Sequence, residues 1–207
     1  MQKKNYQKEL DKKIEQIVSE KKVPRLFLHS CCAPCSSYCL SYLADYFKIT
    51  IFYYNPNISP AEEYQKRVEE QKRLISELPV KNKVSFAEGK YEPEKFFEMA
   101  KGLQNIPEGG ERCFKCYEMR QREAAVYAAE NGFEFFTTTL SISPHKNAAK
   151  LNEIGLKLEK EYGIRYLVSD FKKKGGYLKS IEYSRQYDLY RQNYCGCVYS
   201  KMEAEKR

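Results

Sequence analysis

Apolar and polar positions along this chain change period from block to block, as they do where strands and helices alternate. Five short runs rich in β-branched and aromatic residues predict strands, at 23–30, 48–55, 83–89, 133–141 and 164–171. The segments between them have a helical period and predict helices, at 36–47, 61–78, 92–103, 113–132 and 143–163, with another at 181–190. Strands that alternate with helices predict an α/β fold with a mainly parallel sheet.

The first 22 residues are charged and predict a lead helix at 5–20, in front of a single α/β catalytic domain at 23–207 that carries the metal site. This segment has neither the apolar stretch nor the small-residue cleavage site of a signal peptide. No apolar run in the chain reaches the ~18–20 residues that a bilayer span needs. We therefore expect a cytoplasmic protein with no membrane partner.

The eight cysteines are the strongest chemical signal in the chain, because structural disulfides are disfavoured in a reducing compartment. They form three groups: Cys31, Cys32, Cys35 and Cys39; Cys113 and Cys116; Cys195 and Cys197. Zinc sites are usually built from two tight knuckles, whereas this chain has more sulfurs than one zinc ion needs. Thiolate-rich sites suit iron–sulfur clusters as well as zinc, so both remain open.

In the first group, adjacent Cys31 and Cys32 cannot form an unstrained disulfide with each other, and their thiolates repel unless a metal neutralises them. Cys35 is expected at the start of the next helix, where free N–H groups stabilise a thiolate. Cys39 follows one turn later beside leucines, so we expect it to be structural, as a small buried hydrophobe.

The other two groups each place two sulfurs close together. The CxxC of Cys113 and Cys116 begins a predicted helix, where the thiolates can converge on one metal or pair reversibly. Gly196 lets the backbone bend so that Cys195 and Cys197 face the same way. That pair can either ligate a metal or cycle between dithiol and disulfide.

Three further segments fall at predicted strand ends, where parallel sheets place their ligand chemistry. His29 either orients the cysteine loop or is an ordinary strand-end histidine. In SPHKN (143–147), Ser143, Lys146 and a helix N-terminus can hold a phosphate or ribose, or form a plain helix cap. Asp170 is a candidate oxygen ligand or proton donor, with a turn residue as the alternative.

The charge balance is basic, with 36 Lys and Arg against 28 Asp and Glu and a net charge of +8. Together with 18 Tyr, this fits a polyanionic partner such as tRNA, although a solvated Lys/Glu surface fits equally well. A basic, tyrosine-rich segment at 177–194 is suited to stacking on a nucleobase. The chain has no GxGxxG and no GxxxxGK[ST], which argues against a Rossmann dinucleotide site and a Walker NTPase.

Four motifs in order, HSCCAPC, ERCFKCYEMR, SPHKN and GGYLKSIEYSRQYDLYRQNYCGCVYS, resemble the QueH-type epoxyqueuosine reductases. The resemblance covers roughly residues 24–200. It implies an open five-stranded, mainly parallel sheet with helices on both faces, similar to the adenine nucleotide alpha-hydrolase (HUP) group. It also implies the last step of tRNA queuosine biosynthesis, the cobalamin-independent reduction of epoxyqueuosine at the tRNA anticodon, with an unidentified electron donor.

The resemblance also implies roles for individual residues. The family's 4Fe–4S site is similar to the cysteines Cys31, Cys32, Cys113 and Cys116. The family's redox-active pair matches Cys195 and Cys197, which form a disulfide when oxidised. We expect Cys35 to help bind an additional mononuclear iron, and Asp170 or a tyrosine to protonate the leaving oxygen. Two other functions stay open: a zinc-stapled RNA-binding module and a thiol–disulfide oxidoreductase.

Overall fold

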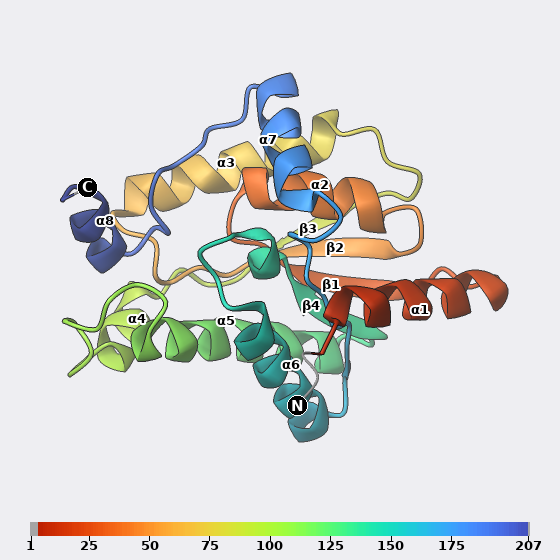
Figure 1. Ribbon diagram of the computed structural model, residues 1–207, viewed down its shortest axis with the longest axis horizontal. Coiled ribbons are helices and arrows are strands. Elements are labelled where there is room, and N and C mark those ends of the chain that lie inside the picture. The colour runs from red at the N-terminus through yellow and green to blue at the C-terminus, as the bar shows by residue number, and fades with distance from the viewer. Residues whose placement is uncertain (1–3, 207) are drawn as a thin grey trace.

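The computed structural model describes residues 4–206, and its centre is a five-stranded sheet with the order β3-β2-β1-β4-β5 (Figure 1). Every neighbouring pair of strands is parallel. The strands are β1 (Arg25–His29), β2 (Lys48–Tyr53), β3 (Ser85–Glu88), β4 (Phe135–Thr138) and β5 (Arg165–Tyr166). This confirms the predicted α/β class with a parallel sheet, and the strand order is consistent with the HUP group.

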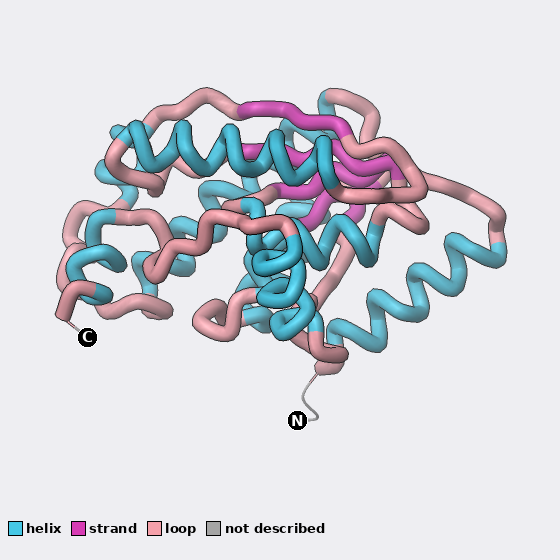
Figure 2. Tube along the Cα trace, turned by 90° about the horizontal axis from the view of Figure 1, so that it is seen from above, coloured by secondary structure: helices cyan, strands magenta, loops and turns pink. Residues whose placement is uncertain are grey.

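Helices cover both faces of the twisted sheet, which runs between them in Figure 2. They are α1 (Tyr6–Ser19), α2 (Ala33–Leu43), α3 (Ala61–Glu77), α4 (Pro93–Met99), α5 (Glu111–Glu130), the 3-10 turn η1 (Thr139–Ile142), α6 (Ala148–Tyr162), α7 (Gly176–Gln186) and α8 (Val198–Ala204). No helix among residues 4–206 is long and apolar enough to cross a membrane.

The central strand β1 shows why the core has two sides. Successive side chains of a strand point to opposite faces. Leu26 and Leu28 pack in the cluster that α1, α2 and α7 cover, whereas Phe27 packs in the cluster that α5 and α6 cover. Because both faces of β1 are buried, its three middle residues are all apolar. The lead helix α1 joins the first of these clusters through Leu10, which is fully buried.

Two helix starts differ from the sequence predictions. Helix α2 begins at Ala33, with Cys32 as its N-cap and Pro34 in the first turn, where proline's fixed φ suits a helix start. The predicted caps Ser36 and Ser37 are buried inside the helix instead. Helix α7 begins at Gly176, earlier than the predicted 181–190.

The segment after β4 also differs. The strand was predicted to run to 141, but it ends at Thr138, whose side chain accepts a hydrogen bond from the Leu140 N–H and diverts the chain into η1. Helix α6 was predicted to begin at 143. It begins at Ala148, because the Asn147 side chain caps it by accepting from the Lys150 N–H at 3.0 Å. Residues 143–147 therefore form a loop.

Candidate metal and thiol centre

The first cysteine group lies directly after β1, at the carboxyl edge of the sheet. β1 sits between β2 and β4, where the strand order changes direction, and such switch points are where open α/β sheets bind ligands. The backbone here is held from β2: the Ser30 N–H donates to the Phe52 carbonyl at 2.9 Å, and Asn55 Nδ2 donates to the Ser30 carbonyl at 2.8 Å. These bonds fix the position from which Cys31 and Cys32 project.

Three thiols of this group form one cluster. The sulfurs of Cys31, Cys32 and Cys35 all lie within 4.8 Å of one another, and those of Cys31 and Cys32 are 3.8 Å apart. Cys31 is 8% and Cys32 6% exposed. Such a donor set of soft, buried sulfur atoms matches what zinc, copper(I) and iron–sulfur clusters require. The residues therefore fit a thiolate-bound metal, and Cys35 belongs to the set together with its two neighbours.

The three thiols do not ionise alike. The Cys32 and Cys35 thiols donate hydrogen bonds toward the Cys31 sulfur, and this lowers the pKa of Cys31 well below its usual value. The same interaction raises the pKa of Cys32 to about 12, and that of Cys35 well above its usual range. Of the three thiols, Cys31 is therefore the most readily ionised. A bound cation would favour all three thiolates.

His29 ends β1 without entering the cluster. It is fully buried, and its Nε2 lies 3.1 Å from the Tyr54 carbonyl while its Nδ1 lies 2.9 Å from Thr138 Oγ1. A carbonyl only accepts, so the proton sits on Nε2 and Nδ1 accepts from the threonine hydroxyl. Both nitrogens are engaged, and His29 joins the ends of β1, β2 and β4. Of the two sequence hypotheses, the structure supports a buried strand-end histidine.

The burial of His29 predicts a loss of stability in acid. Desolvation and the nearby Arg120 charge lower the pKa of His29 from 6.5 to about 3. Above pH 6.5 the ring is neutral in both states. Below it, the unfolded chain takes up a proton that the native chain does not, so stability falls as the pH falls. From pH 7.5 to 5 we expect this residue to contribute about 2 kcal/mol of that loss.

Urea unfolding at pH 7.5 and pH 5 measures this effect. The His29→Gln variant lacks the titrating group, so its stability should fall less between the two pH values than that of the wild type. Equal losses in both proteins would mean that His29 is charged in the native state or that other groups dominate.

The other two cysteine groups meet each other in a second place. One small cavity of about 20 Å³ is lined by cysteines of both groups. Cys113 and Cys116 come from the first turns of α5, and Cys195 and Cys197 from the loop before α8. The Gly109 N–H donates to the Cys113 sulfur at 3.3 Å. Burial raises the pKa of Cys116 to about 12. The CxxC and CGC motifs, about 80 residues apart in the chain, are therefore neighbours in the fold.

The CGC loop is anchored on both sides of its glycine. The Arg67 Nη1 donates to the Cys195 carbonyl at 3.3 Å, and the Ser200 N–H donates to the Cys197 sulfur at 3.4 Å, so Cys197 caps α8. Gly196 has a φ of +122°, and a Cβ there would lie 2.9 Å from Ile58 Cγ1. Only glycine fits this conformation and this contact.

Replacing Gly196 by alanine should therefore strain the loop and push Cys195 away from its position. We expect a loss of at least about 1–2 kcal/mol in unfolding free energy, with a lower turnover. Gly163→Ala is the matched control, because Gly163 also has a positive φ but a Cβ there meets nothing within 4 Å. Urea unfolding and activity of both variants separate loop displacement from backbone strain alone. If both variants lost stability and activity to the same extent, the contact of a Gly196 Cβ with Ile58 would not matter.

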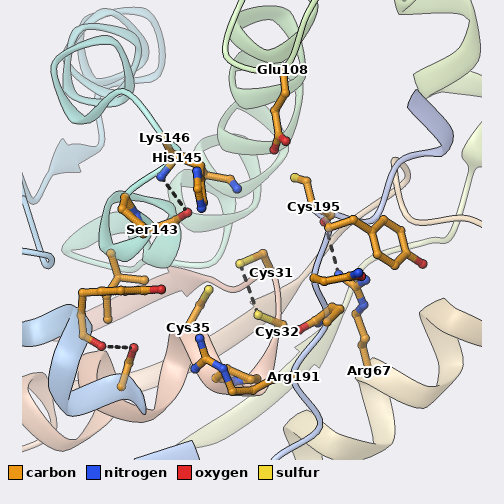
Figure 3. A pocket seen from close by; sticks show the side chains of 18 residues that line it. Cys31, Cys32, Cys35, Arg67, Glu108, Ser143, His145, Lys146, Arg191 and Cys195 are labelled. Carbon is orange, nitrogen blue, oxygen red and sulfur yellow. Dashed lines mark hydrogen bonds between the residues drawn. The ribbon is translucent and has the colours of Figure 1, made fainter. Parts of the chain in front are cut away.

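The three-thiol cluster lies at a cavity of about 290 Å³, which Figure 3 shows from close by. The cavity is lined by Cys31, Cys32, Pro34, Cys35, Arg67, Glu108, Ile142, Ser143, Pro144, His145, Lys146, Tyr177, Ser180, Arg191, Gln192, Asn193, Tyr194 and Cys195. Lys146 and Arg191 bring positive charge to its walls. Cys195 and Glu108 line both this cavity and the smaller one, so the two thiol sites adjoin each other.

Lys146 reaches this cavity from the loop at 143–147, rather than from a helix N-terminus as the sequence had suggested. Burial lowers the pKa of Lys146, but Cys195, Tyr117 and Cys31 outweigh it and raise the pKa well above its ordinary value. The ammonium group therefore stays protonated. Ser143 lines the same cavity, and its hydroxyl accepts from the His145 N–H at 3.3 Å.

Two predicted residues lie away from the cavity. Asp170 is not among the lining residues, and its carboxylate pairs with Lys172 at 3.2 Å. Its suggested role as a proton donor stays a prediction. Cys39 is completely buried, with 0% of its surface exposed, and it packs in the core with Leu40 and Leu43. Its environment is the structural one predicted for it.

The sequence analysis did not identify three buried arginines near the thiols: Arg112, which lines the small cavity, and Arg67 and Arg120. Arg67 follows Tyr64 by three residues and precedes Gln71 by four, on the buried side of α3. Arg120 lies four residues after Cys116 and four before Ala124, on the buried side of α5. A charged residue at a buried position of a helical period is a signal of a partner in the core. That signal was present in both helices.

Comparison with known proteins gives a consistent result. A family model described as "Epoxyqueuosine reductase QueH" matches residues 26–203. The chain is 45% identical over 206 residues to the epoxyqueuosine reductase QueH of Staphylococcus epidermidis, covering 98% of this chain and 87% of the relative. It is 42% identical over 201 residues to that of Streptococcus pyogenes serotype M1, covering 96% and 79%. The similarity to that of Thermotoga maritima is 33% over 185 residues, covering 88% and 93%.

Proposed function

Because the chain belongs to the QueH family of epoxyqueuosine reductases, we propose that it reduces epoxyqueuosine in tRNA to queuosine with an iron–sulfur cluster held by its cysteines. The observation that carries this proposal is the cluster of three thiols, two of them buried and one partly buried, at a cavity with cationic walls. The reaction is the last step of queuosine formation in tRNA. We propose that it proceeds in the cytoplasm, without cobalamin and with an electron donor still to be identified.

The proposed ligands of a 4Fe–4S cluster are Cys31, Cys32, Cys113 and Cys116. Cys113 packs against the same apolar cluster as Cys31 and Cys32, which supports a common site. The Cys35 sulfur lies within 4.8 Å of those of Cys31 and Cys32, so it can ligate an additional mononuclear iron beside the cluster. Such a cluster supplies one electron at a time.

The Cys195/Cys197 pair can supply the number of electrons that the reaction needs. Conversion of an epoxide to an alkene consumes two electrons and two protons and releases water. Oxidation of two thiols to one disulfide releases two electrons and two protons. The reaction therefore balances as epoxide plus dithiol giving alkene, disulfide and water, after which the donor must reduce the disulfide. Cys195 lines the large cavity, so this reservoir lies beside the place proposed for the substrate.

The cavity walls suit a nucleotide of an anticodon loop. Lys146 and Arg191 can bind phosphate groups, and the Tyr177 ring can stack on a base. Protons for the leaving oxygen can come from the Lys146 ammonium or the Tyr177 hydroxyl, both of which line the cavity. Asp170, which does not line it, is the weaker candidate.

The proposal is tested on anaerobically purified protein. Its iron, sulfide and zinc contents are measured, and its activity is assayed on tRNA that contains epoxyqueuosine. We expect iron and acid-labile sulfide in the protein, and nucleoside analysis should show loss of epoxyqueuosine and gain of queuosine. Zinc without sulfide, even after reconstitution, would favour the zinc-stapled RNA-binding module. Activity on disulfides without any metal would favour a thiol–disulfide oxidoreductase.

A further inference from the structure

Three arginines are almost completely buried within residues 4–206, and they differ in how their charge is balanced. Arg67 is 2% exposed, and its Nε donates to the Glu63 carboxylate at 2.7 Å. Arg112 is 1% exposed and pairs with Glu203 at 3.3 Å. Arg120 is also 1% exposed, but no ion pair to an Asp or Glu forms in the part of the chain that the structure describes. Its charge needs another partner.

The hydrogen bonds of Arg120 leave most of its donors free. Its Nη2 donates to the side-chain oxygen of Asn55, a neutral acceptor. Its Nε and Nη1 are buried and have no hydrogen-bond partner among residues 4–206. A guanidinium stays charged at any pH at which proteins fold, so it cannot escape this situation by losing its proton. A buried charge with unused donors is unfavourable unless an anion balances it.

The groups around Arg120 that can become anionic are thiols. Arg120 lies one helical turn after Cys116 on α5, so the two side chains share a face. Its partner Asn55 also holds the Ser30 carbonyl, directly before Cys31. Burial lowers the pKa of Arg120, but the interaction with the sulfurs of Cys116, Cys31 and Cys195 outweighs it and raises that pKa. Through Asn55, Arg120 connects the helix of the CxxC motif to the backbone directly before Cys31.

We propose that Arg120 is a positioning residue whose guanidinium compensates the negative charge of the thiolate-bound cluster and raises its reduction potential. This inference rests on the proposed function, because it assumes that the cysteines hold a redox cluster. Four thiolates around a 4Fe–4S core leave a net negative charge, and reduction adds one more. Arg120 supplies the opposite charge from within the core, with two N–H groups free to point at sulfur.

The sign of the effect follows from electrostatics. A fixed cation stabilises the reduced, more negative cluster more than it stabilises the oxidised one. Removal of that cation lowers the equilibrium constant for reduction, and the effect is large because a buried pair is poorly screened. A neutral substitution should therefore make the midpoint potential more negative.

An EPR-monitored redox titration of anaerobically purified protein tests this directly. For Arg120→Gln we expect the equilibrium constant for reduction to fall tenfold or more, a shift of about 59 mV or more for one electron. Arg120→Lys keeps the charge and should stay within about threefold of the wild type. Arg122→Gln is the matched control on the same helix, because Arg122 is a third exposed and pairs with Glu118 and Glu161. The midpoint potential of the cluster should be the same in this variant as in the wild type.

The outcomes separate this inference from the proposed function. Wild-type protein that cannot be loaded with iron and sulfide overturns the cluster and the role of Arg120 together. A wild-type cluster whose potential is the same in Arg120→Gln overturns the role of Arg120 alone. If Arg120→Gln fails to hold a cluster whereas Arg120→Lys holds one of unchanged potential, the charge requirement is supported.

A second variant covers the case in which neither Arg120 variant folds. Asn55→Asp retains the arginine and places a carboxylate against the same guanidinium, which cancels its charge toward the cluster. We expect the midpoint potential to become more negative, with the equilibrium constant for reduction lowered tenfold or more. An unchanged potential in this variant overturns the proposal.

Discussion

Replacing Cys31 by serine is expected to remove most of the bound iron and to reduce turnover of epoxyqueuosine-containing tRNA by ~100-fold or more. Residues that only orient a metal ligand already cost 10–100-fold when mutated, so loss of a ligand should cost at least ~100-fold. Cys31 is also the thiol whose pKa the neighbouring thiols lower, which makes it the first of the three to ionise. Iron and sulfide analysis and a nucleoside assay measure the two effects.

Cys39→Ala is the matched control for this variant. Cys39 lies in α2, the helix that follows Cys31, and is fully buried, but it packs among leucines rather than at the cavity. It should keep its iron and its activity while losing some unfolding free energy, since a buried thiol is replaced by a smaller group. Normal iron content and turnover in Cys31→Ser would show that this cysteine is not a ligand.

Replacing Cys195 or Cys197 by serine is expected to leave the iron content intact and to reduce multiple-turnover activity by ~100-fold or more. The proposed reason is the loss of the two-electron reservoir rather than of the cluster. If the two thiols act as one unit, each single variant and the double variant should lose activity to a similar extent. Iron analysis, together with steady-state assays of all three variants, measures this.

A different pattern would assign the pair another role. The structure places these thiols around the same small cavity as Cys113 and Cys116, so metal ligation is the competing role. Loss of iron in Cys195→Ser would identify it as a ligand. Full activity in the double variant would require a second electron reservoir elsewhere in the protein.

Much of the fold could be predicted because local patterns decide it. The five strands and most helices followed from hydrophobic period, and the alternation of strand and helix implied a parallel sheet with a ligand edge. Errors concentrated where a single side chain ends or begins an element. Thr138 and Asn147 form hydrogen bonds that compete with the regular backbone pattern, and composition alone does not show which side chain will do so.

The sequence predicted which residue types form the site, but it predicted their spatial arrangement less well. Cysteine spacing identified three groups, and Cys31, Cys32 and Cys35 do converge. Spacing did not show that the CGC pair would meet the CxxC pair, because that contact depends on how the loop before α8 packs against the start of α5. Asp170 looked equivalent to the other strand-end residues, but the turn after β5 directs it toward Lys172.

The fold class, the family and the number of thiols follow from the amino-acid sequence, since these depend on period, motif and residue chemistry. The packing of the chain was needed to show which thiols are neighbours, that His29 is neutral and structural, and that Arg120 is a buried charge with no carboxylate partner among residues 4–206. The physical reason is that electrostatics and burial depend on distances across the fold. Residues such as Asn55 and Arg120 meet only after the sheet and helices have packed.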